Sequence, residues 1–286
     1  KSKPAKTIKD LQTSAYQKLV KHVWHPEFEV DTLLGHVLGQ ERTWLYAHPE
    51  QKVKPNQQRL FQSLVTRRIK REPFAYLTGS IEFFGQDFLV NKDVLVPRPE
   101  TELLVFHALD IIANEGIKTF VDIGTGSGAI LLSVATKAKG SLAYFGTDIS
   151  TKALAVTKKN KQRLVPKKNI TFIKGDLLKP LEKLKIKHPL LVAANLPYLK
   201  PAETKKKQLS YEPMVALTGG KAGLELIYKL IAQFKEIALP GDSMVLEIGA
   251  MQAKAIKKYV KLQIPKAKVE ITKDYSSFDR NVIIKI

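Results

Sequence analysis

The sequence contains no cysteine, and this absence excludes several kinds of chemistry. Without thiols the chain has no disulfide, no thiolate metal site and no cysteine nucleophile. Acidic residues are scarce beside basic ones, because 27 Asp and Glu stand against 47 Lys and Arg, for a formal net charge of +20. No apolar run is long enough to span a membrane, and no secretory signal follows the basic residues at the start. We therefore expect a cytoplasmic protein without membrane association.

The positive charge is spread along the chain rather than gathered in one motif. Lysines are dense in residues 158–168 and 205–207, and no aromatic residues alternate with them as they do in proteins that bind single-stranded nucleic acid. Two interpretations carry equal weight. The lysines form solvated surfaces, or they give the protein a weak, non-specific attraction to RNA or ribosomes.

Residues 1–75 are predicted to form a small helical bundle. Apolar residues recur at three and four positions over residues 7–71, and Thr7, Asp31 and Asn56 are candidate N-caps. We expect its core and rim to hold four ring-bearing side chains: Trp24, His36, Trp44 and Tyr46. A helical module without a catalytic constellation, placed before a nucleotide-type domain, is more typical of partner recognition than of a second active site.

Residues 76–95 are predicted to form a β-hairpin linker. Two runs rich in β-branched and aromatic residues, 81–84 and 87–90, flank a short connection that contains Gly85. Over residues 96–286 short apolar runs alternate with helical patterns. This alternation predicts an α/β domain with a doubly wound, mostly parallel seven-stranded sheet and an antiparallel C-terminal edge.

A glycine-rich loop follows the first strand of this domain, 119–123, and precedes a helical pattern at 129–138. The residues of the loop are Gly124, Thr125, Gly126, Ser127 and Gly128. Glycines let the backbone approach a ligand closely and leave the amides of the next helix facing it. Asp148 ends the next strand about 20 residues later, where an acid can accept both hydroxyls of a ribose. The spacing differs from a dinucleotide motif and no P-loop lysine follows, so the loop favours a single adenosine without a polyphosphate.

The third and fourth strands end in further candidate residues. Asp176 and Leu177 follow strand 169–174, where they can hold the amino group and the ring of an adenine. The fourth strand, 189–194, runs into a short polar and aromatic loop of four residues: Asn195, Leu196, Pro197 and Tyr198. Because ligands of doubly wound sheets bind at the carboxyl ends of the strands, we expect all these residues around one site.

The loop after the fourth strand suits a flat group that bears an NH2. The side-chain oxygen of Asn195 and the carbonyl of Leu196 can accept its two hydrogens, and the ring of Tyr198 can cover its face. Taken alone, the four residues also fit an ordinary strand followed by a proline turn. The glycine loop earlier in the chain favours the functional interpretation.

This order of features resembles the class I S-adenosylmethionine-dependent methyltransferases. The resemblance implies that the glycine loop holds S-adenosylmethionine, released as S-adenosylhomocysteine, and that residues 195–198 present a planar nitrogen to the sulfonium methyl. Asn195 would then contact both cofactor and substrate. Leu196 stands where the family pattern Asn-Pro-Pro-Tyr has its first Pro. The loop is thereby also similar to that of rRNA adenine dimethyltransferases, which keeps a nucleic-acid substrate open.

Further segments are similar to the release-factor glutamine methyltransferases, the HemK/PrmC family, and they occur in the family's order over nearly the whole chain. These segments are residues 72–79, 96–102, 211–213, 216–220, 223–224, 246–249, Gln252 and 279–280. The resemblance implies an enzyme that methylates the glutamine side-chain nitrogen in the Gly-Gly-Gln loop of peptide chain release factors, with the helical bundle helping to hold the factor. The sequence shows no metal-ligand spacing, so we expect no metal ion, and we expect a monomer. Two alternatives remain: methylation of an rRNA or ribosomal-protein nitrogen, and a non-catalytic, cofactor-retaining protein that binds ribosomal components.

Overall fold

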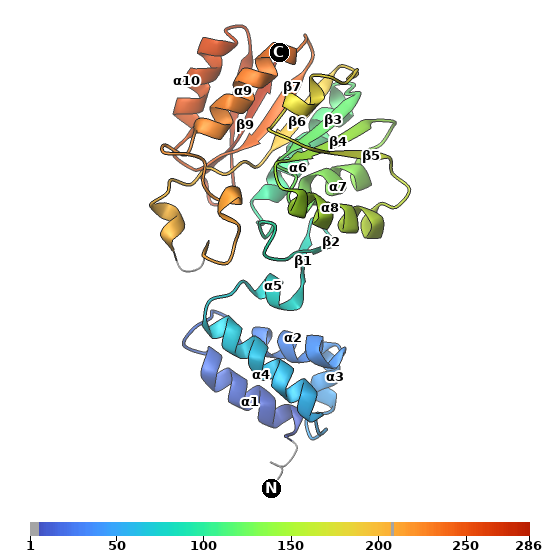
Figure 1. Ribbon diagram of the computed structural model, residues 1–286, viewed down its shortest axis with the longest axis vertical. Helices are drawn as coiled ribbons and strands as arrows, with labels where there is room; N and C mark the ends of the chain where they lie inside the picture. The colour runs from blue at the N-terminus through green and yellow to red at the C-terminus, as the bar shows by residue number, and fades with distance from the viewer. Residues whose placement is uncertain (1–5, 207–208) are drawn as a thin grey trace. The chain divides into compact units, whose positions relative to one another are not determined.

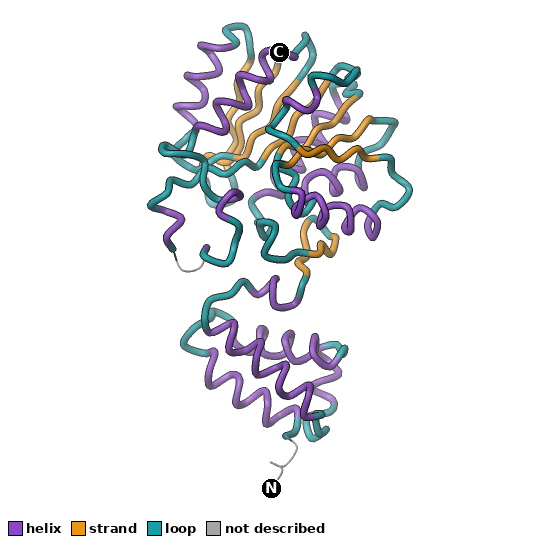
Figure 2. The backbone as a smooth tube through the Cα atoms, in the orientation of Figure 1, coloured by secondary structure: helices purple, strands orange, loops and turns teal. Residues whose placement is uncertain are grey.

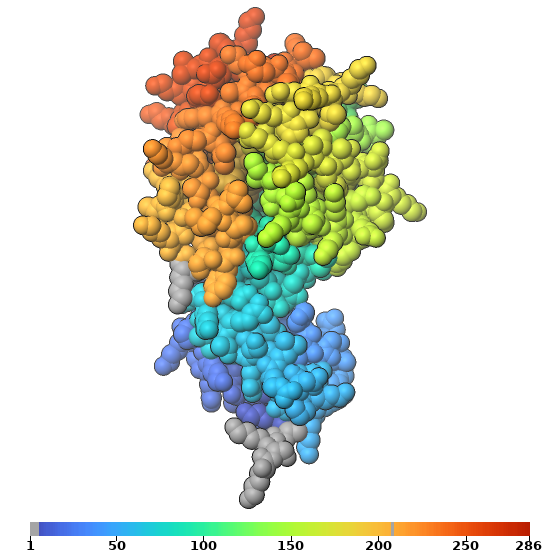
Figure 3. Space-filling view, viewed as in Figure 1, coloured from blue at the N-terminus to red at the C-terminus, as the bar shows by residue number. Residues whose placement is uncertain are grey.

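The computed structural model describes residues 6–206 and 209–286, and the chain divides into two compact units after Gly79. The N-terminal unit is drawn in blue to cyan in Figures 1 and 3. The second unit extends from Ser80 to Ile286. In the described part of the chain, no helix has both the length and the apolar character needed to cross a membrane.

The N-terminal unit is helical, as predicted. Its helices are α1 (Ile8–Leu19), α2 (Pro26–Leu38), α3 (Arg42–Ala47), α4 (Pro55–Ile69) and α5 (Phe74–Thr78). The helices α1, α2 and α4 pack against one another (Figure 1). The apolar positions that recur at helical spacing meet in one core, which includes Leu11, Leu19, Leu33, Leu34 and Phe61.

One of the three predicted helix caps is confirmed. The Thr7 hydroxyl accepts from Asp10 N at 3.1 Å and the Asp10 carboxylate accepts from Thr7 N at 2.9 Å, which is a reciprocal capping box. The other two predictions were wrong. Asp31 is buried inside α2, where it accepts hydrogen bonds from Gln12 and Tyr46. Asn56 lies in the first turn of α4, because Pro55 starts that helix with a residue that has no N–H to satisfy.

The predicted ring-bearing core of this unit was largely wrong. Trp24 is 95% exposed, Tyr46 is 60% exposed and His36 is exposed. Trp44 packs partly on the core and stacks on His48 with ring centroids 4.3 Å apart. Aliphatic residues and Phe61 fill the space between the helices instead.

The predicted hairpin is confirmed as β1 (Ser80–Phe83) paired antiparallel with β2 (Gln86–Leu89). Phe84 and Gly85 between them have φ of 51° and 71°, the left-handed pair that a two-residue hairpin turn requires. Phe83 and Phe88 are buried in a cluster with residues of helix α6 (Thr101–Asn114), so the hairpin packs against α6 within the second unit.

The second unit contains the predicted seven-stranded sheet. Its strands are β3 (Thr119–Ile123), β4 (Ala143–Asp148), β5 (Ile170–Lys174), β6 (Leu190–Ala194), β7 (Ser243–Glu247), β8 (Lys268–Lys273) and β9 (Asp279–Lys285). The spatial order is β5-β4-β3-β6-β7-β9-β8. Figure 2 shows the strands of this sheet in orange, with helices on both sides. The five strands from β5 to β7 pair in parallel, whereas β9 is antiparallel to both neighbours. The order reverses between β3 and β6, where doubly wound sheets form their ligand crevice.

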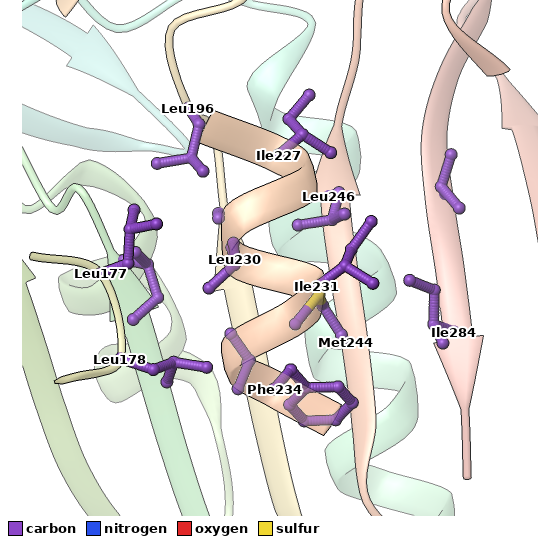
Figure 4. Close-up of a cluster of buried hydrophobic side chains, with 14 of the residues drawn as sticks. Leu177, Leu178, Leu196, Ile227, Leu230, Ile231, Phe234, Met244, Leu246 and Ile284 are labelled. Carbon is purple, nitrogen blue, oxygen red and sulfur yellow. The ribbon is translucent and has the colours of Figure 1, made fainter. Parts of the chain in front are cut away.

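Helices cover both faces of this sheet. On one side lie α6, α7 (Ala129–Lys137) and α8 (Thr151–Leu164), and on the other lie α9 (Glu225–Ile237) and α10 (Ala253–Gln263) (Figure 1). Figure 4 shows how α9 meets the sheet: Ile227, Leu230, Ile231 and Phe234 of α9 lie in one buried cluster with Met244 and Leu246 of β7. Short 3-10 turns at Lys179–Leu181, Glu203–Lys205 and Met214–Ala216 lie in the connections.

Helix α8 was not predicted from the sequence. Its lysines at positions 158, 159 and 161 suggested only a charged stretch. Its buried side has only two larger apolar residues, Leu154 and Val156, beside Ala153, Thr157 and Asn160. A helix with so modest an apolar stripe has a weak periodic signal. It matters for the site, because Thr157 and Asn160 both bond to the glycine loop.

Candidate active site

A cavity of about 200 Å³ lies at the carboxyl ends of the parallel strands in the second unit. Eight of the residues predicted from the sequence line it: Gly124, Gly126, Asp148, Asp176, Leu177, Asn195, Leu196 and Pro197. Thr125, Ser127, Gly128 and Tyr198 do not belong to its lining. The structure therefore brings the glycine loop and Asn195 to one cavity.

The glycine loop needs its glycines for backbone conformation and for close packing. Gly124, Gly126 and Gly128 have φ of 69°, 57° and 86°, which side-chain-bearing residues rarely adopt. A Cβ on Gly128 would lie 2.8 Å from the Thr157 methyl, and one on Gly124 would lie 3.3 Å from Leu196 Cδ2. The loop is thus held between α8 and the loop that follows β6.

Asp148 ends β4 and is bonded to the glycine loop. Its Oδ2 accepts from Gly126 N at 2.9 Å and its Oδ1 accepts from Ser150 N at 2.8 Å. Burial raises the pKa of this carboxyl, although the backbone donors oppose the rise. Each carboxylate oxygen can accept a further hydrogen, so Asp148 is suited to bind hydroxyl groups in the cavity.

Asp176 follows β5 and has a partner that the sequence did not suggest. The Lys229 ammonium on α9 lies 2.5 Å from Asp176 Oδ2. Both side chains are partly exposed, so the pair contributes little to stability. Leu177, beside Asp176, is buried with φ of 56° and offers an apolar surface to the cavity.

Asn195 follows β6, and its side chain has polar neighbours from two other elements. Its Nδ2 donates to Thr101 Oγ1 at 3.0 Å, and the Thr101 hydroxyl donates to Glu247 Oε2 at 2.6 Å. Glu247 is the last residue of the buried strand β7, and burial raises its pKa to about 7. Neither Thr101 nor Glu247 was predicted to have a role. An acid that ends a buried strand at the ligand-binding edge of the sheet is the signal that could have identified Glu247.

Tyr198 lies outside the cavity lining and is held by the chain around it. The Tyr198 carbonyl accepts from Gln252 Nε2 at 3.2 Å, and the same nitrogen donates to the Gly223 carbonyl at 2.9 Å. Gln252 Oε1 accepts from Gly249 N at 2.9 Å. Burial raises the pKa of the Tyr198 hydroxyl. Gln252 therefore ties the loop after β6 to two other connections.

Two segments that carried the family resemblance meet beside the cavity. Arg98 Nη2 lies 2.6 and 2.8 Å from the two carboxylate oxygens of Glu212, which is buried. Burial raises the pKa of Glu212, and the Arg98 charge opposes this. Pro213, Val215 and Ala216 from the adjoining segment line the cavity. The ion pair therefore anchors part of the cavity wall.

Within residues 6–206 and 209–286 no group of three or more His, Cys, Asp or Glu side chains is arranged to hold a metal ion.

Two protein-family models match the chain, and they describe a PrmC N-terminal domain at residues 10–79 and a methyltransferase domain at residues 115–203. A release factor glutamine methyltransferase from Clostridium acetobutylicum is 34% identical over 283 residues, which cover 96% of this chain and 97% of the relative. One from Bacillus subtilis is 34% identical over 90% of each chain.

A solved structure supports the fold assignment. The hMettl16 catalytic domain, in complex with a 3′UTR hairpin, matches with a TM-score of 0.56 at 14% identity, covering 96% of this chain and 89% of its own. A sequence identity of 14% shows a shared fold and nothing more specific. The matches to release factor glutamine methyltransferases extend over nearly the full length of both chains. The chain therefore belongs to the release factor glutamine methyltransferase family.

Proposed function

We propose that this enzyme transfers a methyl group from S-adenosylmethionine to the side-chain amide nitrogen of the glutamine in the Gly-Gly-Gln motif of peptide chain release factors. The cofactor would be released as S-adenosylhomocysteine. The observation that carries the proposal is one cavity lined by the glycine loop, by Asp148 and by Asn195. Membership of the family supports the choice of substrate.

The residues of the cavity fit an adenosine-bearing methyl donor. Gly124 and Gly126 leave the wall free of side chains, and Asp148 offers carboxylate oxygens to the ribose hydroxyls. Asp176 and Leu177 border the place proposed for the adenine. S-adenosylmethionine supplies a methyl group on a sulfonium sulfur, which makes the methyl carbon electrophilic.

The loop after β6 would position the substrate amide. An amide nitrogen is a poor nucleophile because its lone pair is delocalised, so alignment and electrostatic stabilisation must provide the rate enhancement. Asn195 Oδ1 and the Leu196 carbonyl would accept its two hydrogens, while Tyr198 packs against the amide. The bound donor would supply its methyl group to this nitrogen as the carbon–sulfur bond breaks, and the nitrogen would then lose one proton to water. No general base is required before the transfer.

The N-terminal helical unit would recognise the release factor. It matches the PrmC N-terminal domain over residues 10–79, and none of its described residues, 6–79, is among those that line the cavity. We propose a recognition domain at residues 1–75, a hairpin linker at 76–95 and a catalytic domain at 96–286. The enzyme would work as a monomer in the cytoplasm, where a factor of translation termination is its substrate.

Methyl transfer from radiolabelled S-adenosylmethionine tests this function. The purified enzyme is offered a release factor, the same factor with the Gly-Gly-Gln glutamine replaced, and ribosomal RNA. We expect label on the unmodified factor alone. Label on RNA would contradict the proposal and favour the nucleic-acid alternative that Leu196 and the charge of +20 keep open.

A further inference from the structure

Thr101 and Glu247 form a buried polar pair behind Asn195. Thr101 begins α6 and Glu247 ends β7, and their side chains are joined although 146 positions separate them in the sequence. They are 4% and 2% exposed. Neither residue lines the cavity, so neither would contact a ligand there directly.

The hydrogen bonds of this pair have a fixed direction. An ionised carboxylate can only accept, so the Thr101 hydroxyl must donate its one proton to Glu247. Thr101 Oγ1 can then only accept from Asn195, and its partner is Nδ2. The Glu247 carboxyl also interacts directly with the Asn195 side chain. The NH2 of Asn195 is therefore the end that faces Thr101 and Glu247.

We propose that Thr101 and Glu247 are positioning residues that hold the Asn195 amide with its oxygen toward the cavity. This inference rests on the proposed function, in which Asn195 Oδ1 accepts a hydrogen of the substrate amide. The two ends of a primary amide have nearly the same shape, so packing alone distinguishes them poorly. In the reversed orientation an NH2 would face the NH2 of the substrate, and two donors cannot bond to each other.

The charged and titratable groups around Glu247 come from three further elements. Glu100 precedes α6, Tyr198 lies in the loop after β6, and Arg280 belongs to β9. Arg280 favours the ionised carboxylate, whereas Glu100 and above all burial disfavour it. Asn281, directly opposite Glu247 in the β7–β9 ladder, is buried and uncharged.

This balance makes the positioning pair sensitive to pH. With a pKa of about 7, the Glu247 carboxyl gains a proton as the pH falls through neutrality. A protonated carboxyl can donate to Thr101, and the Thr101 hydroxyl can then donate to Asn195 Oδ1. The Asn195 amide would then turn over, with its oxygen toward Thr101 and its NH2 toward the cavity. We therefore expect kcat to decline below about pH 7.

Three variants test the pair, with kcat and KM measured on a release factor and donor affinity measured by calorimetry. Thr101→Val removes the hydroxyl at nearly constant volume and should lower kcat about tenfold or more, which corresponds to about 1.4 kcal/mol in the barrier. Thr101→Ser restores the hydroxyl and should recover most of this loss. Glu247→Gln should lower kcat and abolish its decline below pH 7. Donor affinity should stay within about twofold of wild type in all three.

Thr119→Val is the matched control. Thr119 is a buried threonine at the opposite end of β3, and its hydroxyl donates to the Lys187 carbonyl at 2.7 Å. Its loss removes a buried hydrogen bond away from the cavity, so kcat should stay at the wild-type value. A Thr101→Val enzyme with wild-type kcat, or one that loses only donor affinity, would overturn the proposal.

A readout without turnover separates this proposal from the proposed function. In wild-type protein the side-chain NH2 protons of Asn195 should exchange slowly with solvent in NMR spectra at pH 8, and they should exchange faster in Thr101→Val and Glu247→Gln. Equal exchange in wild type and variants would refute the positioning pair. If wild-type enzyme does not methylate the release factor but its Asn195 NH2 protons exchange slowly, the proposed substrate would be refuted and the positioning pair would stand.

Discussion

The side-chain amide of Asn195 donates from its nitrogen to Thr101, and Asn195 lines the cavity. Asp148, across the same cavity, has both carboxylate oxygens bonded to backbone amides. One residue would thus serve the substrate and the other the cofactor. Substitutions at the two positions should affect different steps.

Asn195→Ala should lower methylation by at least about a hundredfold, because the acceptor that aligns the substrate amide is lost. Donor affinity, measured by calorimetry, should remain close to wild type. The exposed Asn114→Ala at the end of α6 provides a control with an unchanged rate. Equal losses of rate and donor affinity would mean that Asn195 mainly serves the cofactor.

Asp148→Ala should weaken donor binding about tenfold or more, since hydrogen bonds to a charged acceptor are among the stronger ones. Isothermal titration with S-adenosylhomocysteine measures this directly. An unchanged dissociation constant would refute the assignment of Asp148 to the ribose.

Helix α8 connects the hairpin to the glycine loop through one side chain. Asn160 Nδ2 donates to the carbonyls of Leu89 and Ser127, both at 2.9 Å, and its Oδ1 accepts from Leu89 N at 2.8 Å. Asn160 is fully buried, so water cannot reach these backbone groups to take the place of its side-chain hydrogen bonds. The hairpin therefore supports the site through α8.

Asn160→Ala should lower the free energy of unfolding by about 1–3 kcal/mol, because it leaves buried backbone groups unpaired. Urea denaturation measures this change, and donor affinity should fall with it. Asn169→Ala, at an exposed position before β5, should change neither quantity. If both variants behave alike, the bonds of Asn160 do not support the loop.

The whole second unit carries an electrostatic cost in its buried carboxyls. Burial raises the pKa of both Asp122 and Glu247 to about 7. The native state therefore keeps protons that the unfolded chain releases near pH 4. The stability that this proton binding contributes is present below about pH 4 and is lost as the pH rises to about 7.

Glu247→Gln should consequently gain stability relative to wild type between pH 5 and pH 8. A rise of the Glu247 pKa from 4.5 to about 7 corresponds to about 3 kcal/mol at about 1.4 kcal/mol per pH unit. Chemical denaturation of both proteins across this range measures the difference. A difference that does not depend on pH would show that Glu247 titrates as it does in the unfolded chain.

Local patterns sufficed to predict much of the fold. The short connection with Gly85 predicted the hairpin to within one residue, and short apolar runs predicted the seven strands. The glycines between β3 and α7 predicted the loop that lines part of the cavity. These features depend on residues a few positions apart, so the sequence itself displays them. Helix ends were predicted less well. Asp31 and Asn56 are residue types that favour N-caps, but Asp31 lies inside α2, and Pro55 starts α4 one residue before Asn56.

The sequence alone determined the class of fold and the residues that end each central strand. Both follow from local features, namely the periodicity of apolar residues and the positions of glycines. Only the tertiary structure decided which distant side chains meet behind those residues. Asn195 lies 94 positions from Thr101, and Lys229 lies 53 positions from Asp176. Such pairings depend on the strand order and on how α6 and α9 pack on the sheet, and no local pattern encodes that arrangement.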